Sequence, residues 1–153
     1  MENVHKEDLE EEATHATDEA RMVLPGVQAI MGFQLIAVFN QRFESLSFNE
    51  QLLHLAAFFL VTLAMGLIMA PAAYHRQVER GRVTRRFVDL ASALLSLALI
   101  PLMVGVAFDS YILTRLVIGA PGQAVTCAMA VFAVLCGLWF GLPYAYGSRS
   151  HEG

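Results

Sequence analysis

The strongest constraint on this chain is a set of four long segments that are almost free of charge. They cover residues 24–43, 52–74, 88–108 and 124–146. Each is about 20 residues long, which is the length that an α-helix needs to cross a hydrocarbon core of roughly 30 Å. A helix of a soluble bundle would carry a polar face, but no charged residue lies between Leu90 and Phe108 or between Ala124 and Tyr146. The pattern predicts an all-α fold, a four-helix transmembrane bundle.

The distribution of charge agrees with a membrane protein. Charged residues make up 16% of the chain, against about 25% in a typical soluble domain. Eight of the 14 acidic residues fall within the first 20 positions, and five of the 10 basic residues lie between Arg76 and Arg86. Residues 1–16 are therefore predicted to be an acidic, disordered tail. Residues 17–146 form the membrane domain, and residues 147–153 are a short C-terminal tail.

The first span is the most polar of the four. Thr17 followed by two acidic residues is typical of a helix start, and Pro25 fits the first turn of a new helix. We therefore expect a short N-terminal interfacial helix over residues 17–23, a break at Pro25 and then the span. Gln28 falls near the edge of that span and Gln34 near its middle. Both amides are expected to form hydrogen bonds between helices.

The basic residues predict the orientation, because short loops rich in Lys and Arg remain cytoplasmic. A cytoplasmic loop between the second and third spans would leave only Arg42 and Arg115 on the outer side. The prediction is N-in and C-in, in a cytoplasmic (inner) membrane. The loop arginines serve this topology, or they bind anionic lipid headgroups as well. They are Arg80, Arg82, Arg85 and Arg86.

Ionisable residues near the spans are interpreted as boundary groups. Asp89 lies beside the loop arginines, and Asp109 lies near Arg115. No carboxylate is expected near the middle of the membrane, which argues against an ion-coupled antiporter. His54 and His75 are expected at opposite interfaces. They are separated by about 31 Å of helix and cannot both ligate one haem.

Motifs for catalysis and cofactors are not apparent in the sequence. No Cys/His cluster has metal-ligand spacing, and no glycine pattern suits a nucleotide. No set of nucleophile and base is visible. We therefore expect no cofactor, no metal, no nucleic-acid partner and no enzymatic activity.

The fourth segment carries small residues four positions apart. They are Ala133, Gly137, Gly141 and Ala145. Small residues allow helix backbones to approach closely in lipid. This small-residue stripe is expected to pack within the bundle or, as the alternative, to form an interface between subunits.

Three short motifs suggest a family. They are R-x-x-L-P-G-x-Q from Arg21 to Gln28, G-F-x-L starting at Gly32, and A-P-x-x-x-H-R ending at Arg76. In this combination, over roughly residues 19–146, the chain resembles a family of small bacterial integral membrane proteins that is catalogued only as a domain of unknown function. The resemblance implies four spans and a bacterial membrane, but no activity.

The motif positions suggest a polar cluster that joins the first two spans near the cytoplasmic face. Its members would be Arg21, Gln28, His75 and Arg76. The cluster would act as a structural clasp or, as the sharper hypothesis, as a site for an anion or substrate.

Taken together, these features predict a small integral membrane protein that assembles with itself or with a larger membrane partner. The alternative is a transporter or channel for a small solute or ion, acting as an oligomer. A polar pathway through the first and third spans would favour transport. A dry interior of small residues with one exposed seam would favour assembly.

Overall fold

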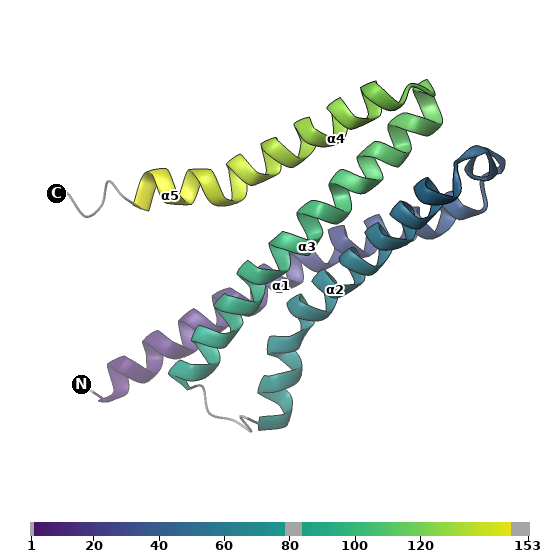
Figure 1. The fold of residues 1–153 in the computed structure, drawn as a ribbon. Coiled ribbons are helices and arrows are strands. Elements are labelled where there is room, and N and C mark those ends of the chain that lie inside the picture. Colours follow the sequence, from purple (N-terminus) through teal and green to yellow (C-terminus); the bar gives the residue numbers. More distant parts are fainter. Residues whose placement is uncertain (1, 79–83, 148–153) are drawn as a thin grey trace. The chain divides into compact units, whose positions relative to one another are not determined.

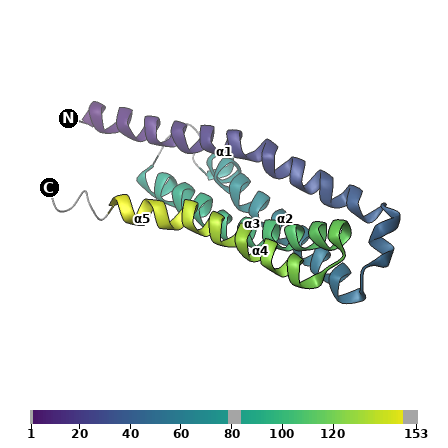
Figure 2. The same ribbon diagram turned by 90° about the horizontal axis from the view of Figure 1, so that it is seen from above.

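The structure is a computed structural model that describes residues 2–78 and 84–147, and the side chains of residues 11–77 and 84–145. In these residues every regular element is a helix, as predicted (Figures 1 and 2). The order is α1 (Glu2–Val38), η1 (Gln41–Ser45), α2 (Phe48–Val78), α3 (Arg85–Ile118), α4 (Pro121–Cys136), η2 (Gly137–Gly141) and α5 (Leu142–Gly147). The element η1 is a 3₁₀-helix, and η2 is a π-helix that joins α4 to α5.

Four helical stretches in the described part are long and apolar enough to cross a membrane. They are Glu11–Val38, Phe48–Gln77, Arg85–Ile118 and Pro121–Ala145. The predicted four-span transmembrane fold is therefore confirmed, and the protein is a multi-pass membrane protein. The second and third helices extend beyond the predicted segments, whereas the first ends at Val38 and not at residue 43.

The helix α1 is continuous, so the prediction of a separate interfacial helix and a break at Pro25 is wrong (Figure 1). A proline inside a helix removes one hydrogen bond and frees the carbonyl four residues earlier, here that of Arg21. Leaving the helix would free several more backbone groups, which is costly next to lipid. The helix also includes residues 2–16, where a disordered tail was expected. Pro71 and Pro101 are likewise accommodated inside α2 and α3.

The chain forms two compact units. Unit 1 comprises Met1–Phe33 and Val61–Pro101, and unit 2 comprises Gln34–Leu60 and Leu102–Gly153. In unit 1, Ala13 of α1 packs in one buried cluster with Phe87, Val88 and Ala91 of α3. The ring of Tyr74 stacks on Phe87 with centroids 6.3 Å apart. Many buried positions are alanines, which allow the close helix contacts that are typical of membrane bundles.

The turn between α3 and α4 follows directly from local sequence. Gly119 ends α3 with φ of 79°, a left-handed conformation that glycine adopts without strain. Its N–H donates to the carbonyl of Arg115 at 3.0 Å. Pro121 then occupies the first turn of α4, where its missing N–H is not needed. The third and fourth spans are thus joined by a tight connection.

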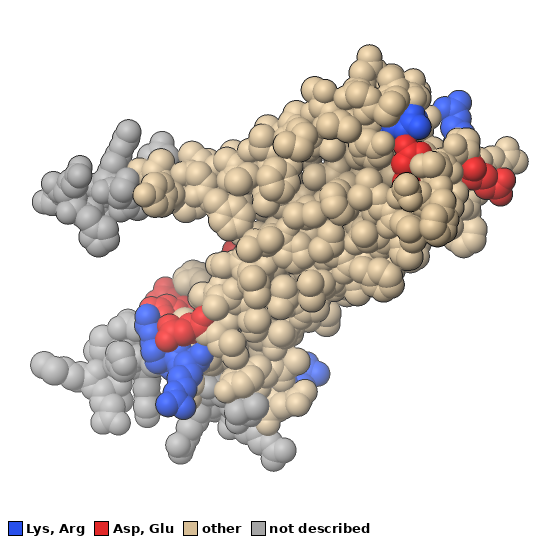
Figure 3. Space-filling model, viewed as in Figure 1, with Lys and Arg blue, Asp and Glu red and all other residues tan. Residues whose placement is uncertain are grey.

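The spans differ in how much of their surface the chain covers. For the most apolar window of each, 39% is buried in the third span, 28% in the second and none in the fourth. On the face shown in Figure 3, most of the surface is formed by uncharged residues. Such a surface suits contact with lipid or with another transmembrane helix.

Candidate functional site

A carboxylate, an imidazole and an amide from three helices meet in unit 2. Gln34 of α1 donates from Nε2 to Oδ2 of Asp109 on α3 at 2.6 Å. The Nε2 atom of His54 on α2 lies 2.9 Å from the backbone carbonyl of Gln34. The His54 Nδ1 atom lies 3.5 Å from Asp109 Oδ1. Gln34 is 3% exposed and His54 is 5% exposed. We call these three residues the polar triad, and its Gln34–Asp109 bond confirms the predicted interhelical role of Gln34.

The positions of the triad residues differ from the sequence-based expectation. Gln34 lies one turn before the end of α1 and not at its middle. Asp109 contacts His54 and Gln34, whereas its expected neighbour Arg115 pairs with Glu50. The antiparallel register of α2 and α3 explains this pairing. About one turn forward in α2 from Glu50 reaches His54, and somewhat less than two turns back in α3 from Arg115 reaches Asp109.

The hydrogen bonds of the triad leave three buried atoms without a partner among the described residues. They are Gln34 Oε1, His54 Nδ1 and Asp109 Oδ1. The 3.5 Å between Nδ1 and Oδ1 is within ion-pair range but too long for a good hydrogen bond. Buried polar atoms nearly always have partners, so three unpartnered atoms in one place require an explanation.

The ring of His54 also contacts an aromatic ring of η1. Phe43 of η1 packs against it edge-on, with ring centroids 5.2 Å apart and planes at 68°. The side chain of Asn40 starts η1 by accepting a hydrogen bond from the Arg42 N–H at 2.9 Å. The 3₁₀ turn between α1 and α2 thus places an aromatic ring over the imidazole.

One turn before His54, Glu50 anchors a second polar network. Its Oε1 accepts from Arg115 Nε at 2.5 Å and from the Tyr111 hydroxyl at 3.2 Å. Its Oε2 accepts from the N–H and the hydroxyl of Ser47, each at 2.9 Å. Arg115 also donates to the carbonyl of Gly119. We call Ser47, Glu50, Tyr111 and Arg115 the Glu50 network, and each oxygen of its central carboxylate has donors.

Sequence reasoning missed His54, Asp109, Glu50 and Arg115 as partners, although one local signal was present. Ser47-x-x-Glu50 before an apolar run is a capping box, which marks the start of α2 and directs the Glu50 carboxylate back to the Ser47 N–H. Glu50 and His54 are four residues apart and therefore share one helix face. A polar pair on one face of an apolar helix needs polar groups opposite it. Those groups come from α3, more than 50 residues away in the chain.

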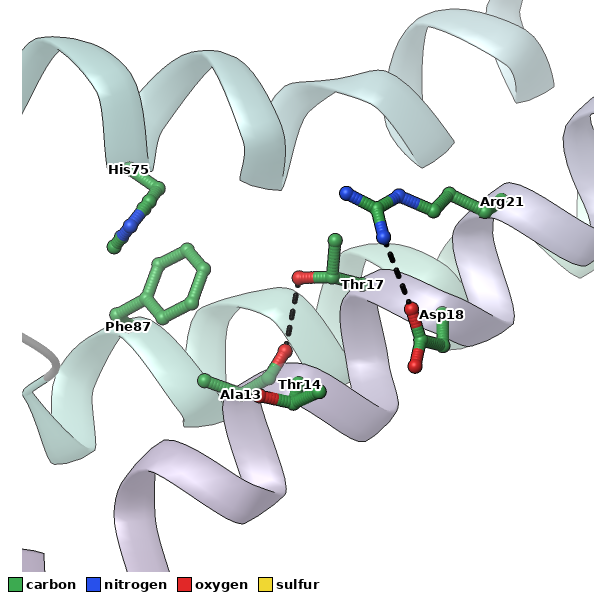
Figure 4. Close-up of a pocket in the computed structure, with 7 residues that line it drawn as sticks. All are labelled: Ala13, Thr14, Thr17, Asp18, Arg21, His75 and Phe87. Atoms are coloured by element: carbon green, nitrogen blue, oxygen red, sulfur yellow. Dashed lines mark hydrogen bonds and ion pairs between the residues drawn. The ribbon is translucent and has the colours of Figure 1, made fainter. Parts of the chain in front are cut away.

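Unit 1 contains an open pocket of about 420 Å³ (Figure 4). Its lining residues are Ala13, Thr14, Thr17, Asp18, Arg21, His75 and Phe87. Arg21 pairs with Asp18 at 3.2 Å, and Thr17 donates to the Ala13 carbonyl at 2.9 Å. The ring of His75 packs against Phe87 with centroids 5.1 Å apart. We call this cavity the Arg21 pocket.

The Arg21 pocket brings together two of the four residues proposed for the polar cluster near the cytoplasmic face. Arg21 of α1 and His75 of α2 both line it. Gln28 and Arg76 are exposed and are not part of its lining. The close-up shows that α1, α2 and α3 each supply a side chain to this region (Figure 4).

The loop arginines are only partly described. Arg80 and Arg82 lie outside the described residues. Arg85 donates to Glu12 at 3.0 Å and also lies 3.4 Å from Asp89, and Arg86 is exposed. The acidic N-terminal segment therefore neutralises one of the arginines that were expected to meet lipid.

The small-residue stripe lies at the surface of the described part of the chain. Ala133, Gly137, Gly141 and Ala145 are all exposed. A Cβ atom added to Gly137 or Gly141 would meet nothing within 4 Å. The interval Gly137–Gly141 is also the π-helix η2, and π-bulges often occur at functional sites.

A comparison with protein-family models identifies the family. The model described as "Family of unknown function (DUF6328)" matches residues 3–143. The chain belongs to this family. The predicted resemblance to a family of unknown function is thereby confirmed. Comparisons with curated proteins and with solved structures found no match.

Proposed function

We propose that the protein is a non-enzymatic membrane protein that acts by assembly, with copies of itself or with a larger membrane partner. The observation that carries this proposal is the fourth span, none of whose most apolar window is buried. Lipid can cover an apolar helix, but lipid gains little from a row of small residues. Another helix gains close backbone contact from the same row.

The residues around the small-residue stripe support this proposal. Val125 and Met129 continue the same side of α4 and are 52% and 61% exposed. Gly137 and Gly141 leave open space where a partner backbone could lie. The fully buried alanines Ala57, Ala64, Ala91 and Ala98, at 0–1% exposed, match the small-residue interior expected of an assembly protein.

Native mass spectrometry of the protein, extracted gently from its host membrane, tests the proposal. The wild type should appear as a discrete homo-oligomer or as a complex with a second protein. The double substitution Gly137→Leu, Gly141→Leu should weaken that association at least about tenfold, equivalent to about 1.4 kcal/mol.

Cys127→Leu is the matched control. Cys127 is exposed and lies about 120° around the helix from Ala133, so this variant should assemble normally. A monomeric wild type, or a double variant that assembles as well as the control, would overturn the proposal.

A second candidate function is transport of a small solute or ion by an oligomer. The polar triad favours it, because an ionisable pair inside a membrane bundle often marks an ion pathway. Flux measured in proteoliposomes should then fall with Asp109→Asn and remain with Glu12→Gln, which removes an exposed carboxylate. Equal flux in protein-free and protein-containing vesicles would reject transport.

We further propose that the protein resides in a bacterial inner membrane with both termini cytoplasmic. The five arginines between Arg76 and Arg86 support this orientation. A fluorescent-protein fusion at the C-terminus should fluoresce, since such fusions mature only in the cytoplasm.

The same arginine loop is proposed to bind anionic lipid headgroups, with Arg86 exposed for such contact. Neutralising Arg80, Arg82, Arg85 and Arg86 together should reduce the anionic lipid that co-purifies with the protein. An unchanged lipid content would exclude this role.

A further inference from the structure

The polar triad has an excess of hydrogen-bond acceptors. The carbonyl of Gln34 can only accept, so the His54 Nε2 atom that lies 2.9 Å away must carry a hydrogen. In a neutral imidazole the other nitrogen, Nδ1, is then a bare acceptor. It faces Asp109 Oδ1, which is also an acceptor. The Oδ1 atom is buried, although the Asp109 side chain as a whole is 24% exposed. Two buried acceptor atoms that face one another need a hydrogen between them.

The amide of Gln34 does not supply the missing donor. Its Nε2 already donates to Asp109 Oδ2 at 2.6 Å. Rotating the amide would place its oxygen against that carboxylate and create a second clash of acceptors. The remaining oxygen, Oε1, is itself without a partner. The triad as a whole therefore contains a negative charge and too few hydrogens.

The groups around His54 do not offset that charge. On α1 the neighbour is the neutral Gln34, on η1 it is the Phe43 ring, and on α3 it is Asp109. On its own helix, Glu50 lies one turn away, but its carboxylate is matched by Arg115. Among the ion pairs of the described residues, Asp109 has His54 alone as a cationic partner.

We propose that the triad is a buried proton-binding site in which His54 holds a proton on Nδ1 and Asp109 is its counter-ion. The proton comes from water and adds to the Nδ1 lone pair, and no other bond changes. The resulting imidazolium donates from Nε2 to the Gln34 carbonyl and from Nδ1 toward Asp109 Oδ1. All three helices of the triad are then joined around one cation.

The choice of a proton over a metal ion rests on the donor set. In the described part of the chain, no three His, Cys, Asp or Glu side chains are grouped as metal ligands. The triad offers one nitrogen and two oxygens, of which one belongs to a neutral amide. A proton needs only two acceptor atoms that face each other, here His54 Nδ1 and Asp109 Oδ1. This site does not depend on assembly through the fourth span.

Nitrogen-15 NMR of labelled histidine side chains in lipid bilayers tests the proposal. A variant in which the four other histidines are replaced by glutamine leaves His54 as the only signal and does not alter the triad. At pH 7.5 a free imidazole is about nine-tenths neutral. The expected result is a His54 ring with hydrogens on both nitrogens at this pH.

Asp109→Asn provides the matched comparison. The asparagine amide can donate to Nδ1 while its oxygen accepts from Gln34, so the fold is satisfied without the extra proton. In this variant His54 should be neutral at pH 7.5, with its hydrogen on Nε2. In the wild type, the thermal unfolding midpoint should decrease as the pH is raised from 6 to 9. In the variant, the midpoint should stay the same over this pH range.

Two results would overturn the proposal. One is a neutral His54 at pH 7.5 in the chain that carries Asp109. The other is a metal ion that co-purifies in a one-to-one ratio and is lost with Asp109→Asn. The first result requires only the single-histidine chain, so it can be obtained even if Asp109→Asn fails to fold.

Discussion

Units 1 and 2 each join two helices through a Glu–Arg ion pair, but the two pairs differ in their surroundings. Glu50 and Arg115 in unit 2 have side chains that are 11% and 22% exposed. Glu12 and Arg85 in unit 1 have side chains that are 47% and 59% exposed. Water therefore screens the second pair more than the first. The enclosure of a polar group, more than its chemistry, therefore decides what the group contributes to stability.

The largest difference is expected from removing the carboxylate of each ion pair. Glu50→Ala leaves the Arg115 guanidinium, the Tyr111 hydroxyl and the Ser47 N–H without their acceptor. It should lower the free energy of unfolding by about 3–5 kcal/mol. Glu12→Ala should lower it by about 1 kcal/mol or less. Unfolding by SDS in mixed micelles, followed by circular dichroism, measures both. Equal losses in the two variants would contradict the comparison.

A smaller difference is expected from the two histidines of α2. His54→Leu removes the hydrogen bond to the Gln34 carbonyl and leaves Asp109 without its counter-ion, so it should cost about 2–3 kcal/mol. His75→Leu changes an exposed ring that lines the Arg21 pocket and packs against Phe87, and it should cost about 1 kcal/mol or less. The same unfolding assay separates the two. A greater loss with His75→Leu would mean that the open pocket is the more important structural site.

The smallest difference is expected from two hydroxyl groups. Tyr111→Phe removes a bond from α3 to Glu50 on α2 and should cost about 1 kcal/mol. Thr17→Val removes a bond from Thr17 to a carbonyl of its own helix, and such bonds add little to helix stability. Its effect on the free energy of unfolding should be near zero. A Tyr111→Phe variant with a higher free energy of unfolding than the wild type would mean that the Glu50 network does not stabilise unit 2.

Much of the fold was predictable because the relevant signals are local. The lack of charge over each span predicted four membrane helices. Gly119 and Pro121 define the turn after α3 by backbone preference alone. The break at Pro25 was predicted from the same kind of rule and is wrong, because the rule describes helices in water. In a bilayer, no water is present to form hydrogen bonds with the backbone groups that a break at a proline would free.

The candidate site was predictable only in part. Gln34 stood out as a polar residue in an apolar segment, and its bond to another helix was expected. Its partner was not, because Asp109 lies 75 residues away and the contact depends on how three helices align. His54 and Asp109 each resembled an ordinary boundary residue when considered alone. Only their common position in unit 2 distinguishes them from His75 and Asp89.

The sequence by itself determined the helical class, the number of candidate spans and the residues that do not suit lipid. Each of these properties depends on a single segment and the solvent around it, so the hydropathy of that segment predicts it well. The tertiary structure decided which polar residues meet and which span remains uncovered. The second and fourth spans are almost equally apolar, yet 28% and 0% of their most apolar windows are buried. Burial depends on contacts between distant segments, and no single segment encodes them.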